Sequence, residues 1–113
     1  MTPSENAIRT AIEQAIGEHE LILFMKGTPD QPRCGFSART SQALNAAGAE
    51  YFPVNVLEDP EIRANLPRYS NWPTFPQLFI NGELIGGCDI TLELYQSGEL
   101  QRMVKEAGKP APQ

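Results

Sequence analysis

One cysteine in this sequence, Cys34, lies where a thiol is expected to be reactive. It sits in a stretch rich in proline, glycine and cations, which runs from Lys26 to Ser37. An apolar run of strand type precedes the stretch at 21–25, and residues typical of a helix follow it at 38–47. Unpaired amides at a helix N-terminus favour a thiolate, and Lys26 and Arg33 add positive charge. The pattern predicts a lowered pKa and a nucleophilic or metal-binding sulfur at Cys34.

The alternative is that Cys34 is an inert apolar side chain in the core, as is common for a lone cysteine in a small domain. Two prolines and two cations in the same loop suit an exposed, rigid site better than core packing. We therefore favour the reactive cysteine.

The motif Cys34-Gly35-Phe36-Ser37, with Lys26 eight positions upstream, resembles the active-site loop of the monothiol, CGFS-type glutaredoxins. Further matches occur around Trp72-Pro73-Thr74-Phe75-Pro76-Gln77 and at Gly86-Gly87-Cys88-Asp89, so that the resemblance covers nearly the whole chain. It implies an α/β, thioredoxin-like fold with a mixed four-stranded sheet flanked by helices.

The resemblance also implies that four patches meet beside Cys34 and bind glutathione. Its binding residues would be Lys26, Arg63, Phe75, Cys88 and Asp89. Pro76 would follow a cis peptide bond and present the Phe75 backbone to the ligand as if to an added strand. Without the resemblance, Lys26 and Arg63 would be read as solvated surface charges, and Asp89 as a helix cap. Trp72 is expected either to pack as an anchor or to shape the rim of the site.

Two kinds of chemistry compete for Cys34. In the first, its thiolate attacks a glutathione mixed disulfide and a second glutathione resolves the product. Dithiol relatives have a second cysteine where this chain has Ser37, and serine cannot form a disulfide. Cys88 could take that role, but its approach to Cys34 cannot be read from the sequence.

In the second, Cys34 binds a [2Fe-2S] cluster. Such a cluster needs about four thiolates, whereas this chain has two cysteines and one histidine, His19, which we interpret as a surface or capping residue. Two protomers, each contributing Cys34 and one glutathione thiolate, would supply four ligands. The resemblance implies this homodimer, with a role in cluster storage or transfer and iron homeostasis, and with BolA-like proteins and apo iron–sulfur proteins as partners. We prefer this hypothesis, with at most weak oxidoreductase activity. An adaptor without redox chemistry is a minor third hypothesis.

Composition limits the remaining functions. The chain has 113 residues, 41% of them hydrophobic, and a formal net charge of −5. These values predict a single domain, placed over residues 1–108, and argue against a nucleic-acid or membrane-binding surface. The Pro-rich residues 109–113 are expected to form a disordered tail. The first residues lack the features of a secretory signal. Two cysteines without a secretory signal suit a reducing compartment, and we therefore expect a cytoplasmic protein.

Local signals place the elements that must hold these residues. Ser4 is expected to cap a first helix that ends near Gly17, and a strand is expected at 51–56 with Pro53 favouring an edge position. Asp59 and Pro60 begin a short helix that Pro67 should end. Asn81-Gly82 predicts a hairpin between strands at 77–80 and 83–86. Helices should follow at 90–95, capped by Asp89, and at 100–107.

Overall fold

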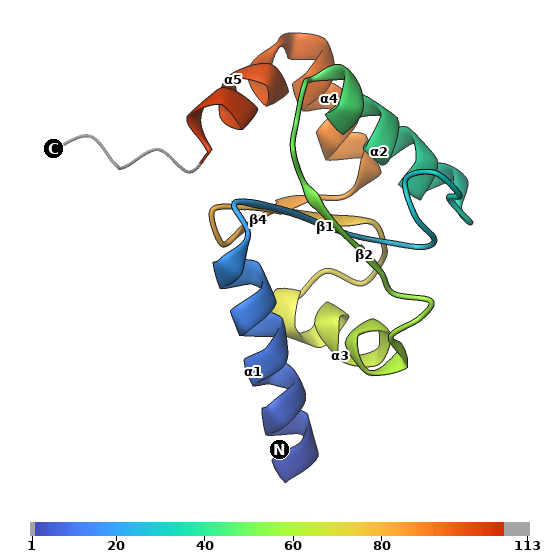
Figure 1. Cartoon of the computed structure of the whole chain (residues 1–113), viewed down its shortest axis with the longest axis vertical. Helices are drawn as coiled ribbons and strands as arrows, with labels where there is room; N and C mark the ends of the chain where they lie inside the picture. The colour runs from blue at the N-terminus through green and yellow to red at the C-terminus, as the bar shows by residue number, and fades with distance from the viewer. Residues whose placement is uncertain (1, 108–113) are drawn as a thin grey trace, which may run out of the picture.

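The computed structural model describes residues 2–107 as a four-stranded sheet between two layers of helices (Figure 1). In chain order the elements are α1 (Pro3–Glu18), β1 (Leu21–Met25), α2 (Gly35–Ala46), β2 (Phe52–Asn55), α3 (Pro60–Ser70), β3 (Gln77–Ile80), β4 (Glu83–Gly86), α4 (Cys88–Ser97) and α5 (Glu99–Glu106). The tail expected at 109–113 lies outside the described residues. Within the described range, no helix is both long and apolar enough to cross a membrane.

The sheet is mixed, and its strands lie in the order β2-β1-β3-β4. Strand β1 is parallel to β2 and antiparallel to β3, and β3 forms an antiparallel hairpin with β4. This confirms the predicted mixed four-stranded sheet. Pro53 lies in β2, an edge strand, where its missing N–H costs no ladder hydrogen bond. The carboxyl ends of the parallel pair β1 and β2 point to the same side of the molecule, where the cysteine loop follows.

Both faces of the sheet are covered, so β1 is buried along its whole length. Successive side chains of a strand point to opposite faces. Leu21, Leu23 and Met25 therefore pack in a cluster with residues of α2 and α5, whereas Ile22 and Phe24 pack in a second cluster with residues of α1 and α3. Figure 1 shows these two layers on opposite sides of the sheet. The continuous apolar run at 21–25 is what such a two-sided environment requires.

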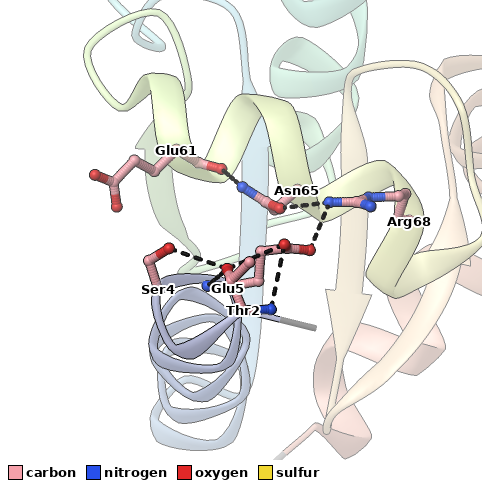
Figure 2. Close-up of polar contacts among 6 residues, drawn as sticks. All are labelled: Thr2, Ser4, Glu5, Glu61, Asn65 and Arg68. Carbon is pink, nitrogen blue, oxygen red and sulfur yellow. Dashed lines mark hydrogen bonds and ion pairs between the residues drawn. The ribbon is translucent and has the colours of Figure 1, made fainter.

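The N-terminus of α1 differs from the prediction, because Thr2 and not Ser4 is its N-cap. The Thr2 hydroxyl accepts the Glu5 backbone N–H at 3.2 Å, and the Glu5 carboxylate accepts the Thr2 backbone N–H at 3.4 Å, which completes a capping box. Glu5 also lies 3.4 Å from Arg68 of α3, which donates to Asn65 at 3.0 Å (Figure 2). Hydrogen bonds from Thr2, helped by Arg68, hold the pKa of Glu5 below its usual value. The cap thus also joins α1 to α3.

The end of α3 is a second correction. Pro67 was expected to stop this helix, but α3 continues to Ser70 with Pro67 inside it. Proline removes one N–H and normally disfavours a helix interior. Here Leu66 is fully buried in the core, and the Pro67 carbonyl accepts the Trp72 N–H at 3.1 Å. Tertiary packing therefore outweighs the local signal, and the helix ends at Asn71 in the left-handed conformation (φ 55°).

Two other local signals are confirmed. Asp59 caps α3 with Pro60 in the first turn, and Asn81 and Gly82 both adopt positive φ angles, 50° and 84°, in the hairpin turn. His19 is the C-cap of α1, as expected for a capping residue, and its ring stacks on Phe52 with the centroids 3.9 Å apart.

Candidate functional site

The residues singled out in the sequence line one cavity of about 860 Å³ at the side of the molecule where β1 ends and α2 begins. They come from five separate segments: the end of β1, the start of α2, helix α3, the loop before β3, and the start of α4. These residues are Lys26, Cys34, Arg63, Phe75, Pro76, Cys88 and Asp89. The fold therefore gathers the whole predicted set around a single opening.

The loop between β1 and α2 is held by hydrogen bonds on both sides of Lys26. The Lys26 backbone N–H donates to the Ser37 hydroxyl at 3.1 Å, and its carbonyl accepts the Arg33 N–H at 2.9 Å. The next N–H, that of Gly27, donates to the Asn55 side chain at 2.9 Å. These bonds fix the backbone from which Lys26 and Cys34 reach the cavity.

Gly27 in the loop and Gly35 at the start of α2 differ in how much space surrounds them. Gly27 has a φ of +93°, and a Cβ there would lie 2.5 Å from the Gln31 carbonyl oxygen and 2.6 Å from the Arg33 nitrogen. Only glycine fits such a close approach of backbone to backbone. At Gly35, beside the cysteine, an added Cβ would meet no atom within 4 Å. Glycine is thus required by packing at position 27 but not at position 35.

Cys34 is the N-cap of α2 and is half-buried. Its interaction with the backbone N–H of Ser37 is the main cause that lowers the pKa of the Cys34 thiol. Burial opposes this effect, and the Phe36 N–H, the Ser37 hydroxyl and the charge of Lys26 lower the pKa further. The pKa of Cys34 is therefore lowered, as predicted, chiefly by the amides at the helix N-terminus, and the charge of Lys26 contributes less.

Ser37 is fully buried, and it interacts with both Lys26 and Cys34. Replacing Ser37 by alanine removes a hydroxyl that favours the thiolate, so the pKa of Cys34 should rise. We expect the rate of Cys34 alkylation by iodoacetamide to reach its half-maximum at higher pH than in the wild type. The loss of one partner for the Lys26 N–H should also cost about 1 kcal/mol of stability.

The matched control is Thr40→Val, which removes another fully buried hydroxyl from the same helix. The Thr40 hydroxyl donates to the Phe36 carbonyl at 2.8 Å, and it is not among the causes of the Cys34 shift. Thr40→Val should leave the pH profile of alkylation unchanged. An unchanged profile in Ser37→Ala would show that the hydroxyl does not act on the sulfur.

One part of the cavity lining is formed where the loop before β3 closely approaches Gly87, at the start of α4. The Phe75–Pro76 peptide bond is cis. A Cβ at Gly87 would lie 3.2 Å from the Pro76 carbonyl oxygen and 3.3 Å from the indole nitrogen of Trp72. Trp72 therefore packs over the backbone of Gly87 as well as lining the cavity. This combines the two roles expected for it, anchor and rim.

The start of α4 corrects a further prediction. Asp89 was expected to be the N-cap, but the cap is Gly87, which has no side chain to satisfy the first amides of the helix. Cys88 begins the helix and is 7% exposed, whereas Asp89 is exposed in the first turn. The helix starts earlier because the extended residue at its entrance is Gly87 (φ −103°, ψ −151°). Gly87, Cys88 and Asp89 line the cavity, so an anion bound at this end of it would lie at a helix N-terminus, where it is stabilised.

Phe36 in the cavity lining and Arg39 beside it were not predicted from the sequence as functional. Phe36 lines the cavity and is 54% exposed, although the sequence shows it only as the aromatic residue two positions after Cys34. Arg39 follows one helical turn later, and its guanidinium carbon lies 5.1 Å from the centre of the Phe36 ring. Nothing in the helix pattern of 38–47 distinguishes Arg39 from an ordinary surface charge.

The donor atoms at the cavity set limits on metal binding. Cys34 and Cys88 are both free thiols. Among residues 2–107, no group of three or more histidine, cysteine, aspartate or glutamate side chains is arranged to hold a metal ion. The part of the chain that the structure describes thus offers thiols and cations to a ligand, not a closed metal cage.

Comparison with known proteins gives one consistent family. Residues 21–85 match the glutaredoxin family. The chain is 56% identical over 95 residues to glutaredoxin 4 of Escherichia coli, covering 84% of this chain and 83% of that protein. It is 51% identical over 105 residues to probable monothiol glutaredoxin 2 of Rickettsia typhi, covering 93% and 95% of the two chains.

A solved structure agrees with these sequence matches. The crystal structure of a buckwheat glutaredoxin–glutathione complex superposes with a TM-score of 0.82 at 27% identity, covering 98% of this chain and all of the other. The likeness extends over the whole sheet and both helical layers, because so little of either chain is left out of the alignment.

Proposed function

This chain belongs to the glutaredoxin family, in its monothiol form, and from that premise we propose that it binds glutathione and carries a [2Fe-2S] cluster between two protomers. The observation that carries the proposal is the convergence of Lys26, Arg63 and the start of α4 on the cavity beside Cys34. The role is storage or transfer of the cluster to apo iron–sulfur proteins and, through it, iron homeostasis.

Glutathione suits the cavity by its functional groups. Its two carboxylates match the cations Lys26 and Arg63 and the unpaired amides at the start of α4, which includes Cys88. Its ammonium matches the exposed carboxylate of Asp89, and its peptide group can pair with the backbone of Phe75. A volume of about 860 Å³ is within the range of small-molecule sites. The buckwheat relative, whose structure is that of a complex with glutathione, supports the same ligand.

The donor set fits a cluster that is shared rather than enclosed. A [2Fe-2S] cluster needs about four thiolates, and the described chain offers one half-exposed thiol, Cys34, and one buried thiol, Cys88. Cys34 from each of two protomers and the thiolate of each bound glutathione make up the set. The lowered pKa of Cys34 favours the ligating form of its sulfur. A cluster held partly by exchangeable glutathione can be released to an acceptor.

A second candidate function is glutathione-dependent thiol–disulfide exchange. The same reactive thiolate that would ligate iron could attack a glutathione mixed disulfide, displacing the other thiol as a thiolate. Ser37 leaves this reaction without a resolving thiol in the same motif. We rank exchange second because cluster binding loses nothing from that serine.

The experiment that tests the proposal is anaerobic reconstitution of the purified chain with iron and sulfide, with and without glutathione. With glutathione we expect visible charge-transfer absorption and a shift from monomer to dimer on size exclusion. Without it, both signals should be absent. Cluster formation that is independent of glutathione would contradict the proposed ligand set. Efficient turnover of a small glutathione mixed disulfide without cluster formation would favour the second function.

A further inference from the structure

The cations of this chain divide into two groups by their pairing. In residues 2–107, all four ion pairs involve Arg9, Arg68 or Arg102. The four cations around the reactive cysteine are in none of them. These unpaired cations are Lys26, Arg33, Arg39 and Arg63. Apart from Lys105 on α5, all the unpaired cations of residues 2–107 therefore lie around Cys34, in a protein with a net charge of −5.

Glutathione would use only half of this charge. Lys26 and Arg63 line the cavity, but Arg33 and Arg39 are exposed on the loop and helix beside it. Between these two arginines in the sequence stands Phe36, the most exposed of the large hydrophobic side chains described. Arg39 lies over its ring at 5.1 Å. An isolated exposed aromatic side chain is unremarkable, but Phe36 lines the same cavity as Cys34 and has the unpaired guanidinium of Arg39 over its ring.

We propose that the surface formed by Arg33, Phe36 and Arg39 docks a protein partner that presents carboxylates next to an apolar side chain. The partner is the macromolecule that exchanges a sulfur-bound group with Cys34, and the inference rests on the proposed function only in taking Cys34 as the reactive sulfur. An apolar side chain would pack on Phe36, and carboxylates would pair with the arginines in the bidentate geometry that guanidinium groups favour.

Charge complementarity decides in favour of this occupant. Two copies docked through these residues alone, without a cluster and glutathione between them, would bring arginines against arginines. A nucleic acid would be repelled by the overall negative charge as an acidic protein is, and it offers no aliphatic side chain to pack on Phe36. An acidic protein is repelled by most of the chain and attracted only at this surface, so its approach is oriented towards Cys34. Asp30 of the loop and Asp89 of the cavity oppose this attraction, but four cations outnumber them.

The test measures how Cys34 discriminates between charged probes in the absence of glutathione and iron. Each probe is a short peptide with one leucine and one cysteine, the latter in a mixed disulfide with thionitrobenzoate. Its other positions are all glutamate in one probe and all lysine in the other. The Cys34 thiolate attacks the peptide sulfur, the new disulfide joins Cys34 to the peptide, and thionitrobenzoate leaves as a coloured anion. The rate with Cys34→Ser is subtracted as the background.

The quantity compared is the reaction rate with the glutamate probe divided by the rate with the lysine probe. A change in the pKa of Cys34 affects both rates equally and leaves this ratio unchanged, because both probes react with the same thiolate. We expect the wild type to prefer the acidic probe by about tenfold or more at low salt, and less as salt is added. The double variant Arg33→Glu, Arg39→Glu should lower this ratio by about tenfold. The matched control is Lys105→Glu on α5, an exposed cation that is also outside the four ion pairs, and it should leave the ratio unchanged.

The apolar part of the surface has its own readout. Phe36→Ala should remove the preference for the acidic leucine probe over an acidic probe with glycine in its place, while the charge ratio stays as in the wild type. A double arginine variant that keeps the wild-type ratio overturns the proposal. So does inhibition by a single-stranded oligonucleotide that exceeds inhibition by polyglutamate at equal charge. Because neither glutathione nor a cluster is present, these outcomes are independent of the fate of the proposed function.

Discussion

Replacing Cys34 by serine is expected to abolish the cluster absorbance and the cluster-dependent dimer together. Each protomer would lose the only half-exposed thiol that the described chain offers, and two glutathione thiolates alone cannot supply about four ligands. A serine hydroxyl stays protonated at neutral pH and is a poor substitute. We expect a near-complete loss of visible absorption after reconstitution, measured beside the molecular mass on size exclusion.

This variant should remain folded, which makes its result easy to interpret. Cys34 is the N-cap of α2, and serine is among the best N-cap residues. Thermal unfolding of Cys34→Ser should therefore occur no lower than in the wild type. The matched control is Cys88→Ser, which changes the other free cysteine, 7% exposed, and should keep most of the signal. Retention of the cluster in Cys34→Ser would show that the ligand assignment is wrong.

Replacing Arg63 by alanine should weaken glutathione binding by about tenfold or more. A hydrogen bond to a charged group contributes roughly 1.5–3 kcal/mol, and the lower end applies because Arg63 is exposed. About 1.4 kcal/mol corresponds to a factor of ten in the dissociation constant. Isothermal titration of the apo protein with reduced glutathione measures the change directly.

The same helix supplies the control for this experiment. Arg68 is also exposed on α3, but it pairs with Glu5 of α1 and not with the cavity (Figure 2). Arg68→Ala should leave the dissociation constant for glutathione as it is. If Arg63→Ala binds glutathione as tightly as Arg68→Ala does, the carboxylate is held elsewhere in the cavity.

Much of the fold follows from local sequence signals because those signals agree with the packing. The apolar run at 21–25 forms the buried central strand, and Asn81-Gly82 turns the hairpin. The N-cap of α1 was missed although Thr2 and Glu5 have the spacing of a capping box. The extension of α3 beyond Pro67 depends on burial of Leu66, which no local pattern reveals.

The functional site was predicted partly from local sequence and partly from the family resemblance. The chemistry of Cys34 could be argued from its place before a helix, but the contributions of Arg63 and Asp89 depended on the family resemblance, since both look like ordinary surface charges. The cis bond before Pro76 likewise came only from that resemblance. The pairs of Arg9 and Arg102 have the i,i+3 or i,i+4 spacing of a helix, but the pairing of Arg68 with Glu5 could not be foreseen from the sequence. Arg68 and Arg63 lie five positions apart on one helix, and only the position of α1 decides which of them meets a carboxylate.

The open space at Gly35 separates access to the sulfur from the stability of the fold. An added Cβ at this position would meet no atom within 4 Å beyond its chain neighbours, and the position needs no unusual backbone angle. Because Gly35 follows Cys34 directly in the chain, we expect a side chain there to affect how a molecule approaches the thiol. Selectivity for the size of the incoming molecule can therefore change by a single substitution while the scaffold stays intact. Gly27, in the loop before α2, allows no such change, because a Cβ there would clash with the backbone, so of these two glycines only Gly35 can be replaced without disturbing the fold.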